Sequence, residues 1–471
     1  MNTEKKSGPD WMGLLQWSLQ YQDGTSPTEL NQLTQEKKEF LAKVFDSMTV
    51  NEPERLHFIC NKMIEYLGQN KYHAYGHLQH IFECKQADNV LHDADKIITD
   101  DDLEEYLEEC EDIVQQIDMA NAFVTKYNGL QYLFMLLLHN CDNNINKKYN
   151  IRCKVASIVA LLSQNNETVQ AVLYKTRIAV GSTEEEVISS LEFFFVLYQS
   201  LSISSNNEGN ENEHERVARL KLCSKVIYII SAVLSFIPFQ QQIFMVGDKG
   251  ADTDANKYNK SNSLCQLLIH GINSNYLPLI KRTIALGDSL IRRYISNKEM
   301  TILAMSGAED RVKITTDTPL SGATTIEELS NAITDQNIEL IATILVPTAL
   351  LYINYSINVD NDVSEEMQRQ RVDLAESSLQ FMHGVSTCTV GVMLLRALGN
   401  ESSLPSSPSA GGATESSVQS SLVACLLKSI QNHQDAIDTA STPGNDHINV
   451  EQLQSETTML KEVVYRILAA Q

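Results

Sequence analysis

Four apolar helical segments recur along the middle of this chain, and each begins with a polar residue. They are KVASIVALL from Lys154, SSLEFFFVL from Ser189, KVIYIISAV from Lys225 and RTIALGDSL from Arg282. The first three begin 35 and 36 residues apart, and a polar stretch at 247–263 precedes the fourth. A helix that is apolar on most sides must bury itself against neighbouring units, so this recurrence indicates stacked helical repeats.

Helical periodicity continues on both sides of these segments. Residues 36–48 place Phe40, Leu41 and Val44 on one face, and the same spacing describes a last helix over 450–468. A helical repeat of about 40 residues is typical of armadillo or HEAT units. We therefore predict an all-α chain that folds as an armadillo-like right-handed superhelical solenoid, with a flexible N-terminal segment and polar insertions.

Polar stretches interrupt the helical pattern at 204–215, 247–263 and 400–421. The last of these is rich in serine and glycine, which is typical of a flexible linker. We expect four parts. These are a flexible segment at 1–30, a helical repeat domain at 31–300, a helical insertion with a serine-rich linker at 301–417, and capping helices at 418–471.

Charge and cysteine content restrict the function classes. The chain has 60 acidic and 37 basic residues and a net charge of -23, which opposes binding to nucleic acid or to anionic membranes. Its nine cysteines are scattered without CxxC pairs, which indicates reduced thiols. The longest apolar run, at 226–239, is shorter than the roughly 20 residues of a membrane span. We expect a cytoplasmic monomer, with the nucleus as an alternative location.

No familiar enzyme motif is present, so we expect no catalytic residue, no cofactor and no metal. His73, His77, His80 and Cys84 are spaced to share one helix face, which leaves metal binding as an alternative to an exposed polar face. The acidic run at 93–112 lacks the glycine turn and ligand alternation of a calcium loop. There TDDDLEE is better explained as the capped start of a helix.

Several segments together resemble a known family. These are LLQWSLQ near the N-terminus, LTQEKKEFLAKVFDSM after it, CEDIVQQIDMANAFVTKYNGLQYL at 110–133, IRCKVASIVALLSQNNETVQ at 151–170 and LKLCSKVIYIISAVLS at 220–235. In order and spacing they are similar to the Fes-type armadillo nucleotide exchange factors of 70-kDa heat-shock protein chaperones, in their cytosolic branch. Gln164 and Asn165 are the most specific short match. Residues 300–400 have no counterpart in that family.

The resemblance implies that the chain is a co-chaperone, not an enzyme. Such proteins bind the ATPase domain of the chaperone, promote ADP release and so assist client release and protein folding. The family's basic contact positions are matched by Arg152, Lys225 and Arg282, and Lys154 lies beside them. Ser189 departs from the pattern, because a lysine would be expected there. The alternative is that these cations are only solvated surface.

Both tryptophans of the chain lie near its start, at Trp11 and Trp17. With Leu14, Leu15 and Leu19 they form a short amphipathic segment. The resemblance implies that the N-terminal region helps to expel client peptide, and we predict this role for Leu14, Leu15, Trp17 and Leu19. Alternatively, these side chains dock on the first helices.

Three hypotheses therefore remain. The first is a chaperone exchange factor, and the second is an armadillo adaptor or scaffold for other proteins. Peptide-binding armadillo grooves use tryptophan and asparagine ladders, and this chain has no tryptophan beyond position 17, which disfavours the adaptor. The third is a metal-dependent enzyme that uses the cluster from His73 to Cys84.

Overall fold

A computed structural model describes most of the chain. The described residues are 51–69, 97–138, 145–179, 187–203, 212–246, 263–305, 332–353, 364–400, 422–440 and 450–469. The chain divides into two compact units, Met1–Phe58 and Ile59–Gln471. Of the first unit, the structure describes residues 51–58, which contain the start of helix α3 (Glu52–Gln69).

The described residues are almost entirely helical, which confirms the all-α prediction. The exception is one small antiparallel hairpin of β1 (Arg177–Ala179) and β2 (Val187–Ser189), in which Ile178 lies opposite Ile188. The predicted last helix is also present as α20 (Val450–Ala469).

Helices of the second unit recur in groups of three, with a short helix, a second helix and a long helix. The first group is α6 (Ile117–Thr125), α7 (Gly129–Leu138) and α8 (Ile145–Ser163). The second is α9 (Glu167–Lys175), α10 (Ser190–Ile203) and α11 (Glu213–Val233). The third is α12 (Ile237–Gln242), α13 (Ser263–Ile272) and α14 (Leu277–Met305). Each group, hereafter a helix triplet, therefore has the same order of a short, a second and a long helix.

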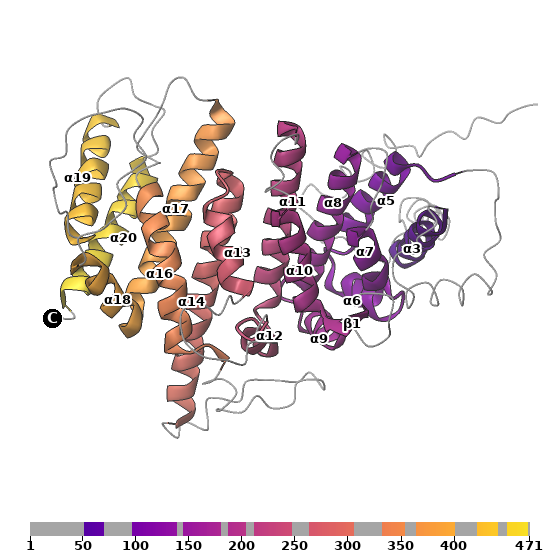
Figure 1. The fold of residues 1–471 in the computed structure, drawn as a ribbon, viewed down its shortest axis with the longest axis horizontal. Helices are drawn as coiled ribbons and strands as arrows, with labels where there is room; N and C mark the ends of the chain where they lie inside the picture. Colours follow the sequence, from indigo (N-terminus) through magenta and orange to yellow (C-terminus); the bar gives the residue numbers. More distant parts are fainter. Residues whose placement is uncertain are drawn as a thin grey trace, which may run out of the picture. The chain divides into compact units, whose positions relative to one another are not determined.

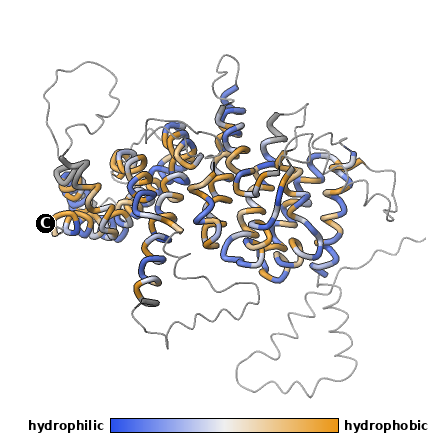
Figure 2. Tube along the Cα trace, turned by 60° about the horizontal axis from the view of Figure 1, so that its bottom comes forward, coloured by the Kyte–Doolittle hydropathy of each residue, from blue (hydrophilic) through white to orange (hydrophobic). Residues whose placement is uncertain are grey.

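The long helices form one row. In this row α5 (Asp100–Ile113) packs on α8, α8 on α11, α11 on α14, α14 on α17 (Glu365–Thr387), and α17 on α20. Figure 1 shows α8 and α11 as neighbours, as it does α14 and α17. Figure 2 shows hydrophobic and hydrophilic residues interspersed along the long helices. Burial of the apolar sides supplies the main stabilising free energy of the row.

The second helices α7, α10, α13 and α16 (Asp335–Tyr352) also contact one another in this order, as the row of second helices. Between α7 and α10, the ring centroids of Phe134 and Phe193 lie 5.2 Å apart in an edge-to-face arrangement. Between α10 and α13, the Tyr198 hydroxyl lies 2.9 Å from Nδ1 of His270. Aromatic contacts and side-chain hydrogen bonds thus fix neighbouring helices of this row.

The apolar segment that begins at Ser189 occupies a different position in the fold from the other three recurring segments. Ser189 ends β2 and precedes α10, in the row of second helices, whereas Lys154, Lys225 and Arg282 lie in the long row. Its hydroxyl accepts a hydrogen bond from the backbone amide of Glu192. Ser189 therefore supports the start of α10 and does not belong with the cations of the long row.

Buried amides tie the helix ends together. Nε2 of Gln170 donates to the carbonyl oxygens of Ser163, at 2.6 Å, and Ala232, at 3.1 Å. Nε2 of Gln240 donates to the carbonyl of Leu234 at 2.8 Å. These side chains bind carbonyls at the ends of α8 and α11, which the helices themselves leave without partners.

Residues 301–417 contribute α16, α17 and α18 (Thr389–Asn400). Within this predicted insertion, α17 packs between α14 and α20 and so continues the long row. The next helix, α19 (Leu422–Ala440), packs on α20. The predicted capped helix start at TDDDLEE is confirmed, since Thr99 and Asp102 form a reciprocal capping box at α5.

Candidate protein-binding surface

The structure places the four predicted cations on three successive helices of the long row. Arg152 and Lys154 lie on α8, Lys225 on α11 and Arg282 on α14. These helices pack against one another in that order. The sequence prediction that these cations belong to neighbouring units is therefore consistent with the fold, but their surroundings differ.

Two of the four cations are engaged within the chain. The Lys154 ammonium forms ion pairs with Glu108 and, at 3.6 Å, with Glu104, both on α5. Arg152 is 9% exposed, and its guanidinium carbon lies 6.0 Å from the ring centroid of Tyr149. An approaching partner would therefore meet a neutralised Lys154 and a largely covered Arg152.

Lys225 has a different environment. It is half-buried, and no carboxylate of the described residues lies within ion-pair distance of it. Burial lowers the pKa of Lys225 below its usual value, and the positive charge of Arg282 lowers it further, while Cys153 and Glu111 act in the opposite direction. Its surroundings thus disfavour the charged form of Lys225, and an acidic group from outside the chain would offset this free-energy cost.

Arg282 is exposed and rests on an aromatic ring. Its guanidinium carbon lies 4.5 Å from the ring centroid of Tyr228 on α11, within the range of a cation–π interaction. The Tyr228 hydroxyl donates a hydrogen bond of 3.0 Å to Oε1 of Gln164, just beyond the end of α8. Gln164, Tyr228 and Arg282 therefore connect three successive long helices.

Asn165 follows Gln164 at the turn beyond the end of α8. Its φ of 54° lies in the left-handed region, which asparagine tolerates better than most residues. This conformation ends α8 and lets Asn166 cap the next helix, since Oδ1 of Asn166 accepts a hydrogen bond from the amide of Val169. The Gln-Asn pair of the sequence resemblance thus has a local role, in which one residue contacts the next repeat and the other turns the chain.

Sequence analysis missed Lys221. It lies one helical turn before Lys225 on α11, is exposed, and has no carboxylate of the described residues within ion-pair distance. The spacing KLCSK, with lysines at i and i+4, was the available signal, because such residues share one helix face. Lys221, Lys225 and Arg282 are hereafter the cation row.

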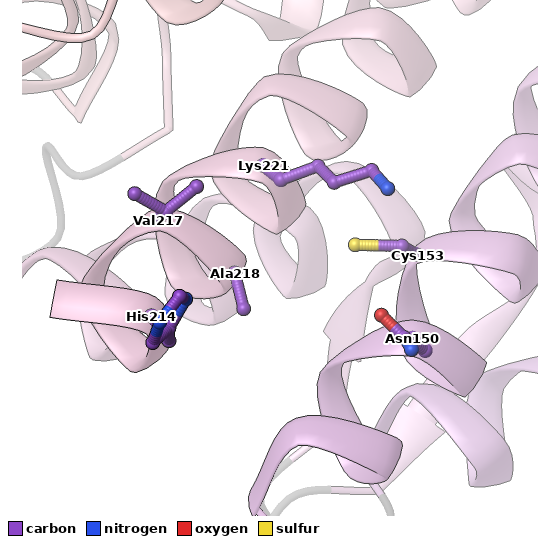
Figure 3. A pocket seen from close by; sticks show the side chains of 6 residues that line it. All are labelled: Asn150, Cys153, His214, Val217, Ala218 and Lys221. Carbon is purple, nitrogen blue, oxygen red and sulfur yellow. The ribbon is translucent and has the colours of Figure 1, made fainter. Parts of the chain in front are cut away.

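An open pocket of about 290 Å³ lies beside the cation row, between α8 and α11. Figure 3 shows the Lys221 side chain extending toward Cys153 and Asn150 on the facing helix. The remaining lining residues, all on α11, are His214, Val217 and Ala218.

The pocket has no evident reactive group. Burial raises the pKa of the Cys153 thiol to about 11, although Lys221, Lys225 and Arg152 favour the thiolate. The thiol is therefore neutral near pH 7 and a poor nucleophile. Within the described part of the chain, no group of three or more His, Cys, Asp or Glu side chains could hold a metal ion.

Two predicted sites lie outside the described residues. One is the client-release segment with Leu14, Leu15, Trp17 and Leu19, and the other is the cluster from His73 to Cys84. Both stay predictions.

No protein-family model matches this sequence, and no curated protein is significantly similar to it. Among the described helices, none alone has the length and apolar character of a membrane span. Glu365–Thr387 and Thr389–Leu395 pass that test only as a pair, with a bend of 111° between them.

Proposed function

We propose that this chain is an armadillo-like solenoid that acts as a nucleotide exchange factor for a cytosolic 70-kDa heat-shock protein chaperone. The helix triplets and the two rows support the repeat architecture, since each triplet buries its apolar faces against the next. Of the five segments that resemble the Fes-type family, the three at 110–133, 151–170 and 220–235 contribute to α5 to α9 and α11, which belong to these triplets or to the long row. The other two lie outside the described residues.

The observation that carries the proposal is the cation row. Lys221, Lys225 and Arg282 have no carboxylate partner among the described residues, although the chain has a net charge of -23. In so acidic a protein, intramolecular ion pairs would be easy to form. Cations without such pairs are consistent with a surface that meets an acidic partner, here the ATPase domain.

Such a surface can promote exchange without making or breaking a covalent bond. Binding shifts a conformational equilibrium only by the difference in affinity for the two states. We propose that the cation row binds the open, nucleotide-free ATPase domain more tightly than the closed, ADP-bound one. By reciprocity, the bound co-chaperone then weakens ADP binding by the same factor.

The test is release of a fluorescent ADP analogue from the chaperone, with and without this protein. We expect acceleration by the wild type and a loss of most of that acceleration in the double variant Lys225→Glu with Arg282→Glu. A matched control reverses two exposed lysines elsewhere, Lys126 on the α6 side and Lys175 on α9. It changes net charge equally and should retain exchange activity. Unchanged ADP release at saturating wild-type protein would refute the proposal.

A further inference from the structure

The pocket between α8 and α11 is small and open, which limits what it can hold. Sites for drug-sized ligands usually measure roughly 300–1,000 Å³ and enclose most of the ligand. At about 290 Å³, with an open mouth, this pocket is too small to enclose a nucleotide. Its size suits one inserted side chain.

The lining specifies the chemistry of that side chain. Val217 and Ala218 offer apolar surface on α11, and Cys153 offers a neutral thiol on α8. Lys221 brings a positive charge, and Asn150 an amide that can donate hydrogen bonds. The combination fits a short aliphatic stem that ends in an anion.

The surroundings strengthen the preference for an anion. Lys221 lines the pocket, and Lys225 lies one helical turn further along α11. Lys225 and Arg282 also repel each other. Among the described acidic side chains, Glu213 pairs with Arg216 at 2.9 Å and Glu108 with Lys154. Glu111 favours the charged form of Lys225 without lying within ion-pair distance of it. Because no described carboxylate lies within ion-pair distance of Lys221, an external carboxylate can pair with it.

We propose that this pocket receives a single aspartate or glutamate side chain from the chaperone's ATPase domain, with its stem on Val217 and Ala218 and its carboxylate at Lys221. This rests on the proposed function for the identity of the partner. It adds that binding of the carboxylate depends on how α8 and α11 are placed relative to each other, because these two helices belong to successive triplets.

Two single variants separate charge from space. Lys221→Met removes the charge and keeps the aliphatic stem, whereas Ala218→Leu fills the pocket and keeps every charge. Each should raise the Kd for the nucleotide-free ATPase domain about 10-fold, measured by titration calorimetry. The double variant should bind no more weakly than the weaker single one, because both changes remove the same contact. Lys175→Met on α9 is the matched control and should bind as the wild type does.

The partner supplies the complementary test. Single Asp→Asn and Glu→Gln variants of the ATPase domain should include one that weakens wild-type binding but has no further effect on Lys221→Met. If the wild type does not bind the ATPase domain, the proposed function fails. If the wild type binds but Lys221→Met or a folded Ala218→Leu does so equally well, the pocket proposal is overturned and the function stands. Should Ala218→Leu not fold, Lys221→Met and the partner scan decide.

Discussion

The guanidinium of Arg282 lies over the ring of Tyr228, 4.5 Å from its centroid, although the two residues belong to successive long helices. The same tyrosine donates its hydroxyl hydrogen to Gln164 beyond the preceding long helix. One side chain thus sets the position of a surface cation and links it to the neighbouring repeat.

Substitutions at Tyr228 should separate these two contacts. Tyr228→Phe keeps the ring under Arg282 and loses only the hydrogen bond to Gln164. We expect it to lower the free energy of unfolding by less than about 1 kcal/mol and to leave chaperone affinity unchanged. Tyr228→Leu removes the ring, releases Arg282 and should weaken affinity by about 3-fold. Urea denaturation and binding titration measure the two effects. Equal affinities of Tyr228→Phe and Tyr228→Leu would contradict a positioning role for the ring.

A second prediction concerns the cost of holding Lys225 charged. Because its pKa is lowered in the folded state, the folded protein binds fewer protons than the unfolded chain just below pH 10.5. Stability should therefore rise with pH in that window. Lys225→Met should be more stable than the wild type near pH 7, by less than about 1 kcal/mol because the site is partly solvated. It should also bind the chaperone more weakly.

The matched measurement is urea unfolding of both proteins at pH 7 and again as the pH approaches 10.5. The stability advantage of Lys225→Met should shrink as the wild-type ammonium loses its proton. A constant advantage across this range would show that charge burial is not its cause. Loss of stability on substitution would contradict the prediction outright.

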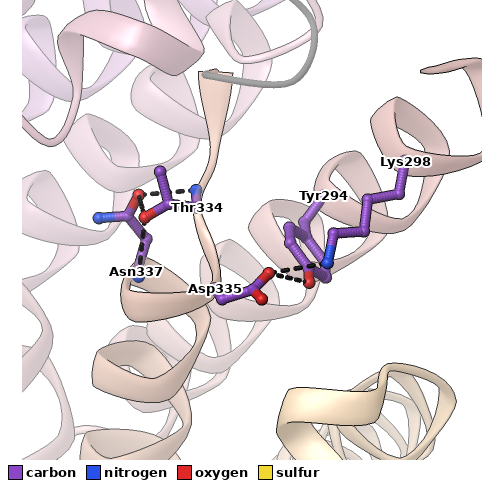
Figure 4. A network of polar contacts seen from close by, with 5 residues as sticks. All are labelled: Tyr294, Lys298, Thr334, Asp335 and Asn337. Carbon is purple, nitrogen blue, oxygen red and sulfur yellow. Dashed lines mark hydrogen bonds and ion pairs between the residues drawn. The ribbon is translucent and has the colours of Figure 1, made fainter.

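The sequence located α8, α11, α14 and α20 of the long row, because their apolar residues recur at helical spacing whatever the neighbour is. Within residues 301–417 the composition shifts, but α16 and α17 pack on α14 much as the earlier long helices pack on one another. At the start of α16, Asp335 accepts a hydrogen bond from the Tyr294 hydroxyl and forms a 2.8 Å ion pair with Lys298, both on α14 (Figure 4). Contacts between residues about 40 positions apart leave no periodic trace in a sequence.

The candidate site was predictable only in part, for a related reason. Recurrence located Lys225 and Arg282, but the same pattern included Lys154, whose charge Glu104 and Glu108 neutralise from α5. Which cations stay without a carboxylate partner depends on the neighbouring helix. Lys221 was missed because it precedes the recurring position by one turn.

Asn165 offers a test of the turn that ends α8. With φ at 54°, its backbone favours glycine or asparagine over residues with an ordinary Cβ. Asn165→Ala should lower the free energy of unfolding by about 1 kcal/mol, whereas Asn165→Gly should be nearly neutral. Thermal unfolding of the two variants checks this. If alanine were tolerated as well as glycine, the left-handed turn would not be required.

A buried pair near the C-terminus should matter more for stability. His433 on α19 lies 3.1 Å from the carboxylate of Glu456 on α20, and both side chains are almost fully buried. Nε2 of Gln452 also donates to Glu456 at 2.9 Å. Glu456→Ala leaves these groups without that hydrogen-bond partner and should cost about 1–3 kcal/mol. The apolar double variant His433→Leu with Glu456→Met should cost much less, and chemical denaturation that ranked the two the other way would contradict this.

The last prediction separates exchange from client release. Residues 12–22 contain Leu14, Leu15, Trp17 and Leu19, and they precede the helix triplets, which bury their apolar faces against one another. Deleting them should leave ADP release intact but reduce displacement of a labelled model peptide, because a large apolar segment can compete for the chaperone's peptide groove. The double variant Leu15→Asp with Trp17→Asp should act alike, since burying unpaired carboxylates is costly. The control is the Lys225→Glu, Arg282→Glu variant, which should lose acceleration of ADP release although it keeps residues 12–22. If the deletion instead lowers thermal stability and exchange together, these side chains dock on the first helices, and the client-release role is wrong.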